Sequence, residues 1–479
     1  MSLFTANQYG FTRTTGRLLV RGSLYSYGFC IIFFIFISSA LFAQQNQNTE
    51  ASRREIIKYG TETEIASLIQ ALRSENINYL DDDLVTLVES TRNQRILTGV
   101  FGFFGERDKN GLEGRAMRAI TEREDETNET ILSAIEYLGR IKASVSVPVI
   151  KDLLDTEERR FLSSGFRAIG AASSSVSQLA DETAEFLIDY YNYRNPGNDN
   201  QGIIIAAVGD TGSLLGIPFL SDIVTNPDSR LALRIAALNA ISKIGDEGGL
   251  EAILSCVGAN DPNVRSAAVR ALGPFNGPSV DNAILDAFRD SYYQTRIAAA
   301  QASRDRKLED AVPFLKFRAE RDEVPNVRDE AIRALGAIAN EEAIGVLESL
   351  FSEARNSDRV RILSCEMLMK NSGDRYFSKT VLELNDAKTR NQTNFYNSLL
   401  KIISEAVVTG NKTEIERVAH SFMQNGTIIE KLYGLDMAAN NDLKSLSDLI
   451  ITLARDRNES LARRARGTAE RLGIEIPAE

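Results

Sequence analysis

The stretch that decides the fold reads Val264-Arg265-Ser266-Ala267-Ala268-Val269-Arg270-Ala271-Leu272-Gly273, and residues 327–336 repeat it as Val-Arg-Asp-Glu-Ala-Ile-Arg-Ala-Leu-Gly. Outward from this stretch, an arginine returns in the same small-residue frame at Arg234, Arg265, Arg296, Arg328 and Arg361. The steps between these arginines are 31, 31, 32 and 33 residues. A fixed period of this size indicates stacked repeats rather than compact domains, because each repeat in a stack contacts only its neighbours.

The apolar residues of the frame lie on one face of a helix. Val264, Ala268, Ala271 and Leu272 stand at i, i+4, i+7 and i+8, which is the spacing of an amphipathic helix. Each frame is followed by a short break and a second apolar stretch. Second helices are therefore expected at residues 250–257, 280–288 and 343–351. The pattern predicts an all-α fold built from pairs of antiparallel helices.

The frame Val-Arg-x-x-Ala-x-x-Ala-Leu-Gly resembles HEAT repeats, especially the short bacterial variety that is also called PBS-lyase-like. The copies at residues 264–273 and 327–336 are complete, whereas the copy around Arg234 has Ser242 in place of the glycine. The resemblance implies a right-handed α-solenoid, an armadillo-type superhelix of stacked helix pairs. It also implies that the frame arginine binds an aspartate of the adjoining repeat, with Asp246 and Asp261 as candidate partners. We therefore interpret the five arginines as structural.

The repeat pattern weakens toward both ends and divides the chain into four regions. We expect a signal peptide or anchor at 1–43, divergent helical repeats at 44–125, a HEAT-repeat core at 126–385, and divergent repeats with a cap at 386–479. Near the start of the second region, Thr61 and Glu64 have the spacing of a capping box. The arginine-rich residues 461–472 could form the polar cap that the end of a solenoid needs.

The first 43 residues have the pattern of a secretory signal. Three arginines precede an apolar run at residues 29–43, which ends in Ala43 and is followed by the polar stretch that begins at Gln44. The alternative is an uncleaved anchor, although the run is shorter than the roughly 20 residues of a spanning helix. The expected location is thus exported, periplasmic or associated with the cell envelope, with membrane contact only through residues 29–43 if the signal is not cleaved.

Charge and composition exclude several classes of function. The chain has a net charge of −11, and removal of residues 1–43 gives −14, so nucleic acid is a poor partner. His420 is the only histidine, which excludes His-His metal sites and disfavours Ser-His-Asp catalysis. It also argues against the HEAT-repeat hydroxylases, whose di-iron site needs several histidines. Cys256 and Cys365 lie in separate repeats and are expected to be buried apolar side chains. No cofactor is expected.

Two stretches depart from the period. The step that contains Tyr190, Tyr191, Tyr193 and Arg194 is 39 residues long and predicts an enlarged loop at residues 190–200. Tyrosine and arginine are enriched in interface hot spots, so these four residues are candidates for partner contact, unless the tyrosines pack on their own repeat. The glycines and phenylalanines at residues 99–105 predict a packed bend, or otherwise an apolar contact patch.

The function expected from these features is that of an exported, non-enzymatic scaffold that binds another protein of unknown identity. Its concave surface or ridge loops would provide the contacts, because solenoids offer long exposed surfaces. One alternative is an enzyme or small-ligand-binding protein, lyase-like, on the same helical scaffold. That alternative needs polar side chains from several repeats to meet in one cluster. Another is a permanent structural component of a machine in the cell envelope.

Overall fold

The computed structural model describes residues 49–75, 77–194, 196–410 and 412–477. Their regular structure is helical, with no strand among the described residues, and the predicted α-solenoid fold is confirmed. None of the helices in these ranges is both long and apolar enough to span a membrane. The signal or anchor predicted at residues 1–43 lies outside the described residues. Contacts between Cα atoms divide the chain into a unit that ends at Tyr137 and a unit that begins at Leu138.

The first unit begins with helical residues 49–59 and continues with α2 (Glu62–Glu75), α3 (Asp81–Ser90), α4 (Gln94–Gly105) and α5 (Glu113–Thr121), while α6 (Asn128–Arg140) crosses into the second unit. The helix α2 packs on α4. The predicted capping box at the start of α2 is confirmed, since the Thr61 N–H donates to Glu64 Oε2 at 2.7 Å and the Glu64 N–H donates to Thr61 Oγ1 at 3.3 Å.

The bend predicted at residues 99–105 is wrong, because this stretch is the second half of helix α4. Phe101, Phe103 and Phe104 are all buried, with at most 1% of their surface exposed. Gly99 faces Ile69, and a Cβ at Gly99 would lie 3.4 Å from the Ile69 side chain. The glycines are therefore places where α2 approaches α4, and burial of the three aromatic rings outweighs the low helix propensity of glycine.

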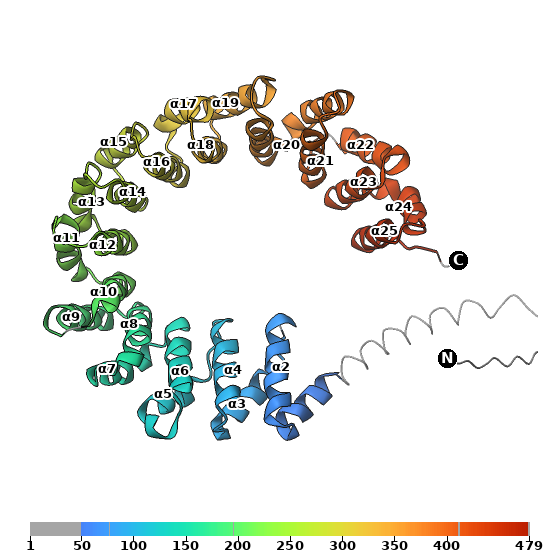
Figure 1. Cartoon of the computed structure of the whole chain (residues 1–479). Coiled ribbons are helices and arrows are strands. Elements are labelled where there is room, and N and C mark those ends of the chain that lie inside the picture. Colours follow the sequence, from blue (N-terminus) through green and yellow to red (C-terminus); the bar gives the residue numbers. More distant parts are fainter. Residues whose placement is uncertain (1–48, 76, 195, 411, 478–479) are drawn as a thin grey trace, which may run out of the picture. The chain divides into compact units, whose positions relative to one another are not determined.

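The second unit is a stack of helix pairs in two layers (Figure 1). The first helices of six successive pairs form what we call the first row: α8 (Arg159–Ser173), α10 (Asn198–Thr211), α12 (Leu231–Ile244), α14 (Pro262–Ala271), α16 (Tyr293–Arg306) and α18 (Pro325–Ile338). The helices between them form the second row: α7 (Val147–Asp155), α9 (Ser177–Tyr193), α11 (Gly216–Thr225), α13 (Leu250–Cys256), α15 (Pro278–Ala287), α17 (Val312–Arg321) and α19 (Glu341–Ser352). Three of these, α13, α15 and α19, confirm the second helices expected from the sequence.

The stack continues with α20 (Asp358–Thr389), α21 (Thr393–Glu405), α22 (Lys412–Asn425), α23 (Ile428–Asn440), α24 (Ser447–Ala454) and α25 (Glu459–Leu472). The helix α20 contains both members of a pair, joined without a loop at Ser372, whose backbone is not helical (φ −151°, ψ 52°). Downstream of this kink, the Asp374 carboxylate accepts hydrogen bonds from the backbone N–H groups of Thr409 and Gly410 at 2.8 and 2.9 Å.

The glycine of the frame sets how closely the first-row helices approach. A Cβ at Gly209 would lie 2.7 Å from both Cα and Cβ of Ala240 on the next first-row helix. Gly170 stands in the same relation to Ala207, whose Cα would lie 2.9 Å from the added atom. The pairing of a glycine with an alanine therefore brings the two helix backbones together, since any larger side chain must push them apart.

Candidate binding surface

Two of the frame arginines form bidentate ion pairs that join one repeat to the next. Arg265 donates from Nε and Nη2 to the Asp290 carboxylate at 2.7 and 2.9 Å. Arg296 donates in the same way to Asp322 at 2.7 and 2.8 Å. Asp290 and Asp322 lie in the loops that follow the second helix of each pair, so each arginine reaches across its own repeat to the start of the following one.

The backbone carbonyls of the same aspartates also accept hydrogen bonds from the next frame arginine. The arginine contacts therefore continue from one repeat to the next. Arg296 Nη1 donates to the Asp290 carbonyl at 2.9 Å, and Arg328 Nη1 donates to the Asp322 carbonyl at 2.5 Å. The Asp322 side chain is fully buried, and the Arg296 side chain is only 6% exposed. Burial raises the pKa of Asp322, but hydrogen bonds from Arg296 and from the Val324 N–H outweigh it and hold this pKa below its ordinary value.

The prediction by analogy that the frame arginines bind Asp246 and Asp261 is wrong. Asp261 is the N-cap of α14 and accepts from the N–H groups of Asn263 and Val264, while Asp246 accepts from the Gly248 N–H at the start of a 3₁₀ turn. Both carboxylates are thus used within their own loops, where an aspartate that precedes a helix satisfies its free N–H groups.

The first and last of the five frame arginines, Arg234 and Arg361, make other contacts. Arg234 donates from Nε to the Val224 carbonyl at 3.0 Å, and its Nη2 lies 3.6 Å from Cys256 Sγ. Arg361 donates to the Phe351 carbonyl at 2.9 Å and to Glu383 at 2.6 Å. These contacts place the frame arginines between helices, away from the surface that a partner would meet.

The tyrosine candidates lie on a helix rather than in a loop, because α9 continues to Tyr193. Tyr190 is 2% exposed and packs edge-on against Phe166, with ring centroids 4.8 Å apart. Arg194 lies over the Tyr190 ring at 4.9 Å and pairs with Asp155 at 2.7 Å. Tyr191 is half-buried against the Phe219 ring of α11, at 5.1 Å. Only Tyr193, which is 84% exposed, projects fully into solvent. The stretch offers one exposed ring, not a cluster.

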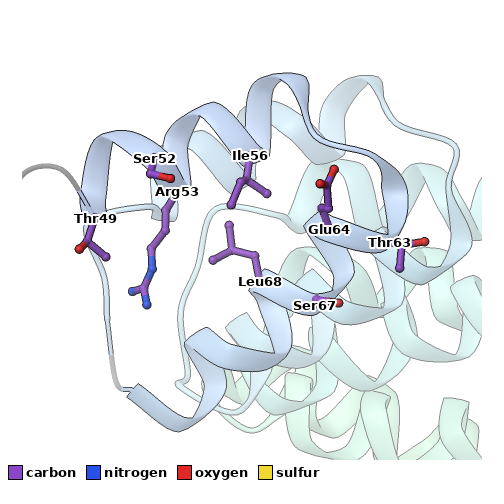
Figure 2. A pocket seen from close by; sticks show the side chains of 8 residues that line it. All are labelled: Thr49, Ser52, Arg53, Ile56, Thr63, Glu64, Ser67 and Leu68. Atoms are coloured by element: carbon purple, nitrogen blue, oxygen red, sulfur yellow. The ribbon is translucent and has the colours of Figure 1, made fainter. Parts of the chain in front are cut away.

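A pocket of about 720 Å³ lies between helical residues 49–59 and α2, where Ile56 and Leu68 point toward each other (Figure 2). Its polar groups are already engaged, since Arg53 pairs with Glu75 at 2.7 Å and Glu64 belongs to the capping box. The backbone N–H of Thr61 holds the pKa of Glu64 below its ordinary value, which keeps this carboxylate ionised. The two charged groups of the pocket are therefore used by the local structure.

The other chemically reactive side chains are dispersed. Within the described ranges, no three His, Cys, Asp or Glu side chains are grouped so that they could hold a metal ion. His420 is exposed on α22, and Cys256 and Cys365 are buried free thiols. Burial raises the pKa of the Cys365 thiol to about 12, so this sulfur is not a nucleophile at neutral pH.

Charge separates the two rows of the second unit. The six first-row helices carry twelve Arg and Lys residues against five Asp and Glu residues. The seven second-row helices carry four Arg and Lys residues against fourteen Asp and Glu residues. The chain as a whole has a net charge of −11, so the first row is a positive surface on an acidic protein.

Part of the positive charge reaches solvent at one position of the frame, three residues before its glycine. This position holds Arg167, Ala206, Asn239, Arg270, Gln301 and Arg333 from α8 to α18. All six are exposed except Gln301, which is half-buried, and none is acidic. The nearby Glu330 is only 7% exposed and is held by Arg304 and Arg333. Sequence reasoning missed this surface because it emerges only once the helices are assigned to rows.

Several solved structures match this chain at low sequence identity. A structure of the karyopherin Kap121p bound to the extreme C-terminus of the protein phosphatase Cdc14p matches with 12% identity and a TM-score of 0.45, and covers 88% of this chain and 53% of that one. Kap121p bound to Nup53p matches with 12% identity and a TM-score of 0.44, over 88% and 52%. The chain thus spans about half the length of these karyopherins.

Human deoxyhypusine hydroxylase in complex with glycerol also matches, with 17% identity, a TM-score of 0.24 and coverage of 58% of this chain and 96% of that one. No curated protein sequence matches the chain significantly. The family model described as "Spirochaete HEAT repeat protein" matches residues 57–468, which include nearly all the described helices. The frame, the stacked pairs and this match agree, and the chain belongs to the family of spirochaete HEAT repeat proteins.

Proposed function

We propose that this protein is an exported, non-enzymatic scaffold of the bacterial cell envelope, and that its first row binds an acidic partner protein. The observation that carries the proposal is the excess of positive charge on the first row, with twelve cations against five acids. Complementary charge guides protein association and disfavours wrong partners. A partner with carboxylates opposite α8, α14 and α18 would contact Arg167, Arg270 and Arg333.

Export is the second part of the proposal, and it is supported by the sequence of residues 1–43. Three arginines precede the apolar run, and small residues lie near its end. N-terminal sequencing of the protein from the producing cells tests this part. A start near Gln44 is expected, whereas an intact Met1 on membrane-bound material would show that the segment is an uncleaved anchor.

The binding surface can be tested with matched charge variants. The first variant replaces Arg167, Arg270 and Arg333 with glutamine, which keeps helix propensity and removes three positive charges. The control replaces three exposed acids of the second row, Glu185, Glu251 and Glu341, with glutamine as well. Both proteins should show the circular dichroism spectrum of the wild type, because all six side chains lie at the surface.

Each protein is used as bait in an extract of the cell envelope, and captured proteins are quantified by mass spectrometry. We expect an acidic protein to be captured by the wild type and by the control, and to be lost with the first-row variant. Higher salt should also release it, because exposed charge pairs are screened. Equal capture by all three baits would contradict the first-row proposal. A co-purified metal or small molecule without a protein would favour an enzyme or ligand-binding function instead.

A further inference from the structure

The helix α17 differs from the rest of the second row. It carries Lys316, Arg318 and Arg321 against one acid, Glu320. The other six second-row helices together carry one cation, Lys151, against thirteen acids. A positive helix within an otherwise acidic row requires a local explanation, because the solubility of a solenoid is served equally well by negative charge.

Exposed aromatic rings accompany this charge. Phe317 of α17 is 49% exposed, and the half-buried Phe314 stacks on Phe288 at the end of α15, with ring centroids 5.7 Å apart. Arginine side chains lie near both rings. Arg289 lies 5.1 Å from the Phe314 centroid, and Arg318 and Arg321 lie 5.2 and 5.8 Å from the Phe317 centroid.

These residues surround a pocket. It has a volume of about 410 Å³ and is lined by Phe288, Arg289, Pro313, Phe314, Phe317 and Arg318. Arg318 is fixed from behind, because it donates to the Phe288 carbonyl and to the Asp322 carboxylate. The side chain of Arg289 is 65% exposed and pairs with Asp286 at 2.6 Å, and Lys316 and Arg321 are also exposed. Lys316, Arg321 and the exposed Arg289 thus place three cations at the rim of the pocket, where an incoming negative charge can reach them.

We propose that this α15–α17 patch, defined by the six lining residues with Lys316 and Arg321, is a second docking site for a partner protein. The partner segment that binds here inserts an apolar side chain into the pocket and has carboxylates on either side of that side chain. The apolar side chain covers the exposed face of Phe317, and the carboxylates pair with Lys316 and Arg321 and compete with Asp286 for Arg289. Aromatic and arginine side chains that surround a pocket are the residues that dominate binding energy at protein interfaces.

Charge on the neighbouring helices favours an acidic peptide segment over a lipid surface. The helices on either side of α17 in the second row are acidic: α15 carries Asp281 and Asp286, and α19 carries Glu341, Glu342 and Glu348. A negative membrane would be repelled on both sides of the patch. A narrow peptide segment can reach the cations of α17 without meeting those acids. The inference is independent of the proposed function of the first row, because it rests on different residues.

The test is a selection of random 12-residue peptides displayed on phage against the full-length protein. A variant with Phe317→Ser and Arg321→Gln serves for counterselection. Both side chains are exposed, so the variant should retain the circular dichroism spectrum and unfolding midpoint of the wild type. We expect enriched peptides that combine a leucine or aromatic residue with flanking acids. Their affinity for the variant should fall about 30-fold, the loss that corresponds to a hot-spot residue.

Three outcomes overturn the proposal. The first is that no selected peptide needs Phe317 for binding. The second is that the peptides that need Phe317 are basic or uncharged. The third is that the wild type, but not the variant, sediments with vesicles of phosphatidylglycerol and phosphatidylethanolamine, which would make the patch a lipid contact. The first-row variant with glutamine at Arg167, Arg270 and Arg333 should bind the selected peptides as the wild type does. Failure of one site is therefore distinguishable from failure of the other.

Discussion

Replacement of Arg296 with alanine should open the stack at one repeat boundary. The Arg296 side chain makes four hydrogen bonds, two to the Asp322 carboxylate at 2.7 and 2.8 Å and two to the carbonyls of Asp290 and Ser291 at 2.9 and 3.2 Å. Its removal leaves the fully buried Asp322 carboxylate with two donors, the Val324 N–H at 3.0 Å and Arg318 at 3.2 Å. A buried charge without its main partner is strongly destabilising.

These contacts give a range for the expected loss in the free energy of unfolding. Loss of one partner of a buried ion pair costs about 3–5 kcal/mol, and the lower end applies because Arg318 and the Val324 N–H remain. The matched control is Arg328→Ala at the next boundary. Arg328 is half-buried and donates to the carbonyls of Asp322 and Glu323 without a carboxylate partner among the described residues. Its loss should cost about 1 kcal/mol, the net value of a hydrogen bond at a partly exposed site.

Urea unfolding followed by circular dichroism gives the change in the free energy of unfolding for each variant. Hydrogen exchange then shows whether residues 290–328 open first, because a solenoid can open locally. A double-mutant cycle with Asp322→Ala should give a coupling energy above about 1.5 kcal/mol, since charged contacts of this kind couple strongly. The reasoning is refuted if Arg296→Ala costs no more than Arg328→Ala, or if the cycle shows no coupling.

The ion pair also predicts how stability depends on pH. Burial raises the pKa of Asp322, but Arg296 and the Val324 N–H hold it below its ordinary value of 3.8 in the folded protein. A carboxylate with a lowered folded-state pKa stabilises the fold above its unfolded pKa, and this stabilisation is lost as the pH falls through the folded pKa. The difference in unfolding free energy between wild type and Arg296→Ala should therefore be constant above about pH 5 and shrink below pH 4. A difference that grows on acidification would contradict this assignment.

Three further outcomes are expected. Gly209→Ala should lower the free energy of unfolding by about 1–3 kcal/mol, because the added Cβ meets the next helix. The control Gly345→Ala, in open space on α19, should raise it by about 0.5–1 kcal/mol. Equal effects of the two variants in urea unfolding would contradict the close approach of the helices at Gly209. Burial raises the pKa of Glu430, but partners including Lys388 lower it to about 2. Glu430→Gln should therefore lower the free energy of unfolding by about 3 kcal/mol at pH 7. In acid unfolding curves this loss should become progressively smaller below pH 4.5. Cys365 should resist iodoacetamide at pH 8 until the protein unfolds, and peptide mass spectrometry that finds rapid alkylation would show that the thiol is accessible.

Local periodicity accounts for the part of the fold that could be predicted. The frame at residues 264–273 and the second helix at 280–288 depend only on apolar spacing within about ten residues. The long repeat step of 39 residues predicts an enlarged loop from Tyr190 onward. The apolar stripe Ala180, Ala184, Leu187 and Tyr190 in fact reaches the start of this stretch, and that spacing is the signal in the sequence for a longer α9.

The partners of the frame arginines could not be predicted because they depend on contacts between repeats. Asp246 and Asp261 are near their arginines in sequence, but each caps its own turn. The carboxylates that do bind, Asp290 and Asp322, both lie six residues before the following frame arginine. The equivalent position before Arg265 is Ala259, and Arg234 accordingly contacts Val224 and Cys256 instead. A spacing rule of this kind links three repeats, and a single repeat does not reveal it.

Structural and exposed arginines on the same helices must be separated before the charge of a row is interpreted. Four of the twelve first-row cations are frame arginines that point between helices: Arg234, Arg265, Arg296 and Arg328. Without them the first row still carries eight cations against five acids. Two of those acids, Asp329 and Glu330, are buried in ion pairs, and one of the eight cations, Arg304, is the partner of Glu330. The second row keeps its four cations against fourteen acids. The contrast between the rows is therefore not a by-product of the repeat architecture, and it remains after the residues that hold the stack together are set aside.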